Sequence, residues 1–194
     1  ADGSFLSEEG INIDMTPVKS GERYFYVWSH RKNIGTPLDT GSMLMIAEFD
    51  PVHPDRLTSE PKCLSRPLYG FENTEHTINN EGPYAFYYHN KIYLAYSGGD
   101  ARGYLYAIGM LTANDGDDLC DLSVWEKAKT PIASFATIPG EYGPGHNSFF
   151  WDRDQNLWIA YHAVTSFEEK IVSSGMRRVY FEQDKTPRFD VIVE

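Results

Sequence analysis

Residues 21–30 read GERYFYVWSH, a turn followed by a run of aromatic and β-branched side chains that favours a β-strand. The pattern recurs at residues 89–99 (HNKIYLAYSGG) and 155–164 (QNLWIAYHAV). Aligned on their aromatic ends, the three copies stand 68 and 65 positions apart. A period of this size is typical of a β-propeller blade, although it is slightly longer than usual.

The rest of the chain also favours strands. Short apolar runs alternate with Gly, Asp, Asn and Pro, and almost no apolar series has helical spacing. Residues 119–127 are the exception, where we expect a short helix capped by Asp118. Three periods fill residues 1–194, whereas propellers close with about four to eight blades. We therefore expect an all-β chain with no second domain, made of about three blades of a larger propeller.

The composition excludes several classes of protein. Hydrophobic residues make up 41% of the 194 residues and charged residues 23%, which is ordinary for a folded domain. The net charge of −11 repels nucleic acid and anionic lipid, so we expect neither as a partner. No apolar run approaches the ~20 residues of a membrane-spanning helix, and residues 1–10 lack the features of a signal peptide. Cys63 and Cys120 are too few for a disulfide framework.

The repeat also aligns three titratable residues. They precede the aligned aromatic residue of their copy by 14, 15 and 15 positions, and they are Asp14, Glu81 and His146. Each lies at the start of the innermost strand of an expected blade. Because these strands begin near the axis of a propeller, equivalent positions there converge. We expect the three side chains to meet in one funnel.

The motifs around these residues resemble glycoside hydrolase family 43, whose members are five-bladed propeller enzymes that cleave arabinofuranosides and xylosides. The resemblance runs nearly from end to end. It is carried by residues 13–16 (IDMT), 80–84 (NEGPY), 96–99 (YSGG) and 143–149 (GPGHNSF). The Glu-Gly-Pro and Gly-Pro-Gly-His pieces are fairly specific together, although either alone is weak. The fold that the resemblance implies is a partial five-bladed β-propeller.

The resemblance also implies roles for the three aligned residues in an inverting glycosidase. Glu81 would be the general acid, and Asp14 would tune and orient it. His146 would lie on the axis near calcium or another metal ion, with contact through a water because Ca²⁺ prefers oxygen ligands. The family's general base is an Asp well upstream of the position of Asp14, and Asp2 is too close to Asp14 to be that residue. We therefore expect the chain to carry the acid without the base.

Three further residues are candidates for substrate binding. Phe71 and Tyr142 lie in expected loops shortly before Glu81 and His146, where an aromatic face could stack on a furanose ring or instead anchor its loop. Both readings stay open. Ser97 belongs to the Tyr-Ser-Gly-Gly motif of the resemblance.

These features together predict a glycoside hydrolase of arabinose-containing plant polysaccharide, with an exo-acting α-L-arabinofuranosidase favoured over a β-xylosidase of xylan degradation. The expected partner is an arabinose- or xylose-containing oligosaccharide, and a second chain or a further segment would complete the propeller. A non-catalytic carbohydrate-binding module is the alternative, since the base is expected to be missing. Relatives of this kind often act outside the cell or in a periplasm, which favours that location here.

Overall fold

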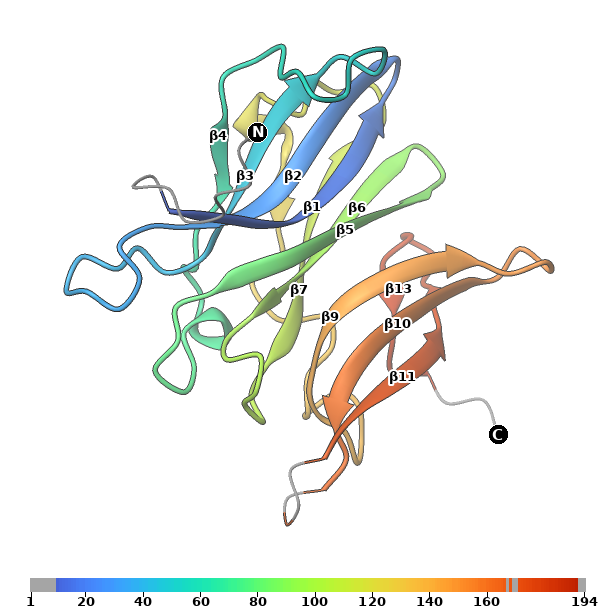
Figure 1. Ribbon diagram of the computed structural model, residues 1–194. Helices are drawn as coiled ribbons and strands as arrows, with labels where there is room; N and C mark the ends of the chain where they lie inside the picture. Colours follow the sequence, from blue (N-terminus) through green and yellow to red (C-terminus); the bar gives the residue numbers. More distant parts are fainter. Residues whose placement is uncertain (1–9, 167, 169–170, 192–194) are drawn as a thin grey trace.

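The computed structural model describes residues 10–166, 168 and 171–191, and these form an all-β chain with no α-helix (Figure 1). Two antiparallel sheets have four strands each, in the orders β1-β2-β3-β4 and β5-β6-β7-β8, and a third has the order β11-β10-β9. A hairpin of β12 and β13 follows. The bounds are β1 Ile11–Ser20, β2 Arg23–Arg31, β3 Met43–Phe49, β4 Lys62–Ser65, β5 Asn80–Tyr88, β6 Lys91–Gly98, β7 Ala107–Asn114, β8 Glu126–Lys127, β9 Tyr142–Trp151, β10 Leu157–Val164, β11 Val172–Arg178, β12 Tyr180–Phe181 and β13 Pro187–Arg188.

The three sheets are successive blades of a propeller. Each begins with its innermost strand, and these strands, β1, β5 and β9, contact one another in turn through the middle of the molecule (Figure 1). The expectation of an all-β partial propeller with about three blades is confirmed.

Two apolar cores separate the blades, one between the first and second and the other between the second and third. Strand β6 shows why, because nearly every one of its residues is buried. Successive side chains of a strand point to opposite faces. Ile92 and Leu94 accordingly pack toward the first blade, whereas Tyr93 and Ala95 pack toward the third. The near-continuous apolar sequence of β6 therefore reflects a sheet that is covered on both sides.

The helix expected at residues 119–127 does not form. The segment contains a single 3-10 turn, Leu122–Val124, followed by the short strand β8. Asp118 accepts a hydrogen bond from the backbone N–H of Cys120, and Asp121 accepts one from that of Ser123. Such local bonds from Asp side chains stabilise turns in place of a continuous helix, which is why the prediction was wrong.

Candidate active site

Each innermost strand is interrupted by a β-bulge at the level of the aligned residues. The pairing register shifts between Ile13 and Thr16 in the first blade and between Glu81 and Tyr84 in the second, with an equivalent shift opposite His162 in the third. The bulged residue has a positive φ in all three blades: 56° at Asp14, 56° at Gly82 and 49° at His146. Bulges re-aim side chains, and here they occur at the same depth in every blade.

The strand pairing places Glu81 one residue away from its expected equivalence. Glu81 pairs with Ser97 in the way that Ile13 pairs with Ser29, so the equivalent of Asp14 in the second blade is Gly82. In the third blade Gly145 takes the position of Glu81, and His146 is equivalent to Asp14. The expectation of three equivalent positions is therefore wrong by one residue for Glu81. Neighbouring residues of a strand face opposite sides, which sends Glu81 toward a different cavity.

The side chains of Asp14 and His146 nevertheless approach each other, and the backbone of Glu81 lies beside them. The His146 Nε2 atom lies 3.8 Å from Asp14 Oδ1. Asp14 Oδ2 accepts hydrogen bonds from the Ser29 hydroxyl at 3.0 Å and from the backbone N–H of Gly82 at 3.2 Å. Because Gly82 directly follows Glu81, these contacts tie Asp14 to the backbone that carries Glu81. The structure thus brings the Asp14 and His146 side chains together beside the backbone of Glu81, whereas the Glu81 side chain lines a different cavity, so the expectation that all three meet in one funnel holds only for Asp14 and His146.

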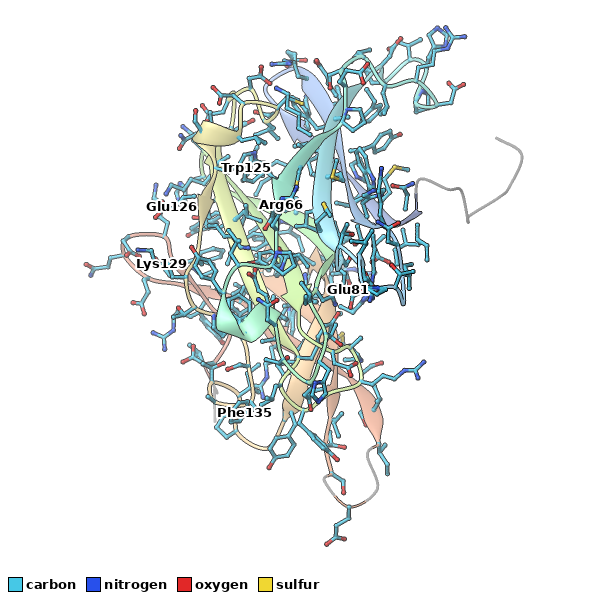
Figure 2. The ribbon with its side chains drawn as sticks, turned by 90° about the vertical axis from the view of Figure 1, so that its left-hand side faces the viewer. Arg66, Glu81, Trp125, Glu126, Lys129 and Phe135 are labelled. Carbon is cyan, nitrogen blue, oxygen red and sulfur yellow. The ribbon has the colours of Figure 1, made fainter. Side chains whose placement is uncertain are left out.

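Glu81 belongs to the inner strand of the second blade, and Figure 2 shows it on the opposite side of the molecule from Glu126 and Lys129. Its Oε1 atom accepts a 2.7 Å hydrogen bond from the Tyr106 hydroxyl. Glu81 lines a cavity of about 380 Å³. The polar residues that share this cavity are Ser29, Arg31, Ser42, Thr77, Asn79 and Asp100. Donors and acceptors of this kind suit a polyhydroxylated ligand.

Arg31 is held in this cavity by a two-point contact with Asp39, at 2.9 Å and 2.7 Å. The hydrogen bonds that Arg31 donates to Asp39 raise the pKa of Arg31, and the same contact holds the pKa of Asp39 well below its ordinary value. Bidentate pairs fix the plane of a guanidinium as well as its charge. Arg31 therefore presents a fixed positive charge beside Glu81.

A second cavity, of about 540 Å³, lies on the other side of the bulges. It is lined by Asp14, Gly82, His146, Asn147 and Ser148, together with residues 15–17 and 83–85. Asn147 is 5% exposed, and its side-chain amide has no hydrogen-bond partner within the described structure. Asp14 and His146 therefore face a space distinct from the cavity of Glu81.

The donors near His146 do not make a calcium cage. Calcium takes six to eight oxygen ligands, and the described residues contain no cluster of three or more His, Cys, Asp or Glu side chains with metal-binding geometry. The residues of the second cavity carry one carboxylate, one amide, the hydroxyls of Thr16, Tyr84 and Ser148, and an imidazole that is about half exposed. These residues do not supply a coordination sphere on their own. The expectation of calcium near His146 through a water stays a prediction.

The structure corrects the expectation for Ser97. This residue is fully buried, so its side chain does not reach a ligand in the cavity. Its Oγ atom instead accepts a 2.7 Å hydrogen bond from the backbone N–H of His146. Ser29 makes the equivalent contact one blade earlier, where its Oγ accepts a 3.1 Å bond from the N–H of Gly82. Each serine therefore connects its own blade, through one hydrogen bond, to the bulge of the following blade.

Neither Phe71 nor Tyr142 is among the described residues that line the Glu81 cavity. Phe71 is partly buried against the core between the first two blades and stacks on Tyr69 with ring centroids 6.4 Å apart. Tyr142 begins β9 and contacts Tyr104 edge to face at 6.2 Å. The packing of Phe71 favours the anchoring alternative for its loop. Stacking of either ring on a sugar stays a prediction.

A buried ion pair supports the backbone that enters the site. Glu72 is fully buried and lies 2.5 Å from the Lys127 ammonium, whose pKa is lowered mainly by burial. The same carboxylate accepts hydrogen bonds from the Asn80 amide at 2.9 Å and the Tyr96 hydroxyl at 2.7 Å. Because Asn80 directly precedes Glu81, the pair fixes the start of strand β5.

Sequence reasoning missed three residues of the site, Ser29, Arg31 and Tyr106. Ser29 had a signal, since it follows Trp28 as Ser97 follows Tyr96 in the repeat. Tyr106 lies before β7, outside the aligned copies, and reaches Glu81 only through packing.

Comparison with known proteins decides the family. The model of "Glycosyl hydrolases family 43" matches residues 4–187. The chain belongs to glycosyl hydrolase family 43. The matched residues include all three blades, in agreement with the resemblance carried by the motifs.

Individual family 43 relatives cover most of this chain. The chain is 32% identical over 156 residues to an extracellular exo-α-(1→5)-L-arabinofuranosidase of Streptomyces chartreusis. The alignment covers 80% of this chain and 45% of that protein. It is 28% identical over 192 residues to a protein of the same name from Streptomyces avermitilis. That alignment covers 94% of this chain and 38% of the Streptomyces avermitilis protein. The crystal structure of α-L-arabinofuranosidase from Lactobacillus brevis superimposes with a TM-score of 0.78 at 28% identity, covering 92% of this chain and 55% of that one.

The chain spans less than half the length of these two Streptomyces relatives. The described part of this family 43 chain contains no helix that is long and apolar enough to cross a membrane.

Proposed function

We propose that this chain carries the general acid of an inverting glycosidase that removes terminal α-L-arabinofuranosyl residues from plant cell-wall polysaccharide. The observation that carries the proposal is the placement of Glu81, which lines a polar cavity beside Arg31 while Tyr106 holds one of its oxygens. The arabinofuranosidase names of the Streptomyces and Lactobacillus relatives support arabinose as the sugar.

In this mechanism Glu81 protonates the glycosidic oxygen as the bond from that oxygen to the anomeric carbon breaks. A water molecule attacks the anomeric carbon from the opposite face and loses its proton to a general base, so the configuration inverts. Glu81 would end the step ionised, and Arg31 stands in the same cavity to favour that negative charge. Arg31 is also positioned to donate to sugar hydroxyls.

Asp14 orients the acid in this proposal. Its carboxylate accepts from the N–H of Gly82 and so fixes the peptide that follows Glu81. The distance from Gly82 N to Asp14 Oδ2 is 3.2 Å, and Ser29 completes the contact from the first blade.

The general base is proposed to come from outside the described residues. An inverting enzyme needs its second carboxylate roughly 6.5–9.5 Å from the acid, with room for a water between them. Asp100 shares the cavity of Glu81 but accepts a hydrogen bond from the backbone of Arg102, as a turn residue does. Asp2, which is too close to Asp14 in the sequence to be that base, lies outside the described residues.

The same relatives support a location outside the cell. Both Streptomyces proteins are named extracellular, and we propose that the present protein is secreted or periplasmic. Fractionation of the producing cells tests this, because activity confined to the cytoplasm would contradict it.

The decisive experiment substitutes Glu81→Gln in the whole protein and measures release of arabinose from arabino-oligosaccharide. The amide cannot donate the proton, so we expect kcat to fall about 10²-fold or more. Glu126→Gln is the matched control, since Glu126 lies on the outer strand β8 and is exposed. Equal turnover by the Glu81→Gln and unmodified proteins would contradict the proposal. Oligosaccharide binding without any release by the unmodified protein would favour a carbohydrate-binding module instead.

A further inference from the structure

Tyr106 is a buried tyrosine whose hydroxyl donates a hydrogen bond to the carboxylate of Glu81. We propose that Tyr106 is a positioning residue that holds Oε1 of Glu81 inside the protein and so directs the acidic proton on Oε2 into the cavity. The inference rests on the proposed function, because it assigns Tyr106 a role only through Glu81. Nothing in the chemistry requires Tyr106 to touch the sugar.

The position of the Tyr106 ring is fixed on several sides. Tyr106 is fully buried, and its ring contacts His162 edge to face with centroids 5.5 Å apart. A Cβ atom placed on Gly145 would lie 2.1 Å from Tyr106 Cε1. Gly145 is the second glycine of the Gly-Pro-Gly-His motif. The absence of a side chain there therefore makes room for the ring that reaches Glu81.

The Tyr106 hydroxyl is the donor in its contact with Glu81. Its one proton points to Glu81 Oε1, at an oxygen–oxygen distance of 2.7 Å. The neighbouring Ser97 hydroxyl accepts from the His146 N–H at 2.7 Å. Burial, and after it the charge of Glu81, raises the pKa of Tyr106 far above its ordinary value, so Tyr106 remains a donor.

A donor on Oε1 has a specific consequence for a general acid. If Tyr106 accepted a hydrogen bond from Glu81, the acidic proton would point into the core and be unable to reach a substrate. Because Tyr106 donates, the protonated form of Glu81 carries its proton on Oε2. In the reaction that proton moves from Oε2 to the glycosidic oxygen, and Tyr106 keeps its own. The hydrogen bond then helps to hold the new carboxylate in place.

The test is a double-mutant cycle in the whole protein with Tyr106→Phe, Glu81→Gln and both together. Each is assayed on arabino-oligosaccharide, whose leaving group needs a proton, and on an activated aryl arabinoside, whose leaving group needs little. We expect Tyr106→Phe to lower kcat on the oligosaccharide about 10-fold, with KM changed less than about twofold. The loss on the aryl substrate should be much smaller. In the Glu81→Gln background Tyr106→Phe should have no further effect.

Tyr93→Phe is the matched control. Tyr93 is buried in the same blade, and its hydroxyl donates to the Lys185 carbonyl at 2.8 Å, away from Glu81. It reports the effect of losing one tyrosine hydroxyl on stability, and we expect it to leave both activities unchanged. Thermal unfolding of all variants separates misfolding from a kinetic effect.

Three outcomes overturn the inference: unchanged oligosaccharide turnover by Tyr106→Phe, equal losses on the two substrates, or losses that add in the double variant. The proposed function fails in a different way, namely when Glu81→Gln by itself leaves oligosaccharide turnover intact.

Discussion

The backbone N–H of Gly82 donates to Asp14 Oδ2 at 3.2 Å, although the two residues are 68 positions apart in the chain. The contact crosses from the second blade to the first, next to Glu81. Both residues are the bulged positions of their strands and both have a φ of 56°. The bulges therefore do more than interrupt the sheets, since they bring a carboxylate of one blade to the backbone beside the acid of another.

Asp14→Asn is expected to keep this hydrogen bond while removing the negative charge. Asn adopts positive φ more readily than most residues, so the backbone should be preserved. We expect the midpoint of urea unfolding to change little and kcat on arabino-oligosaccharide to fall about 10-fold or more. Unchanged kcat would contradict the role proposed for Asp14. The exposed substitution Asp55→Asn serves as the control for loss of one charge.

Gly82→Ala is expected to affect both stability and activity. A φ of 56° disfavours any residue with a Cβ atom by about 1–2 kcal/mol, and here that atom would also lie 3.2 Å from His146 Nδ1. Gly35→Ala is the control, because Gly35 has a φ of 74° with no atom within 4 Å of its Cβ position. We expect urea unfolding to show similar losses of stability in both variants. Only Gly82→Ala should lower kcat, and a comparable loss of activity in Gly35→Ala would refute this.

Lys127→Met is expected to be strongly destabilising. It leaves the fully buried carboxylate of Glu72 without its cation, which costs about 3–5 kcal/mol of unfolding free energy. Lys19→Met provides the comparison, since Lys19 and Glu22 are 3.9 Å apart with side chains 45% and 97% exposed. An exposed pair of this kind contributes about 0–1 kcal/mol. Chemical denaturation of both variants measures the contrast, and equal losses would argue against the buried pair.

Stability should depend on pH through Asp39. The hydrogen bond from Arg31 lowers the pKa of the Asp39 carboxyl in the folded state below its ordinary value of 3.8. A lowered carboxyl pKa contributes stability that is fully present above pH 3.8 and is lost as the pH falls toward the folded-state value. We expect Asp39→Asn to be less stable than the unmodified protein near neutral pH.

The difference between the two proteins should narrow as the pH falls below about 4, where Asp39 begins to be protonated in the unfolded chain. The test is to measure the unfolding free energies of Asp39→Asn and of the unmodified protein from pH 2 to 7. A constant difference across the range would contradict the assignment. Asp55→Asn again corrects for the loss of one charge at an exposed position.

The sequence alone was sufficient for most of the strands, for the three blades and for the meeting of Asp14 with His146. A repeat of turn and strand depends on local patterns, which the chain displays directly at residues 21–30, 89–99 and 155–164. The helix expected at residues 119–127 failed because Asp118 and Asp121 bond to nearby backbone, and a short segment gives little periodicity from which to judge.

The tertiary structure alone decided which way the aligned side chains face. Asp14 and Glu81 differ by one position in their spacing to the aligned aromatic residue, and the turn at residues 152–156 is longer than those of the other blades, which hides the same difference for His146. Since strand side chains alternate, one position separates one cavity from the other. The burial of Ser97 and the contact of Tyr106 with Glu81 likewise depend on packing between strands far apart in the chain, which no local pattern records.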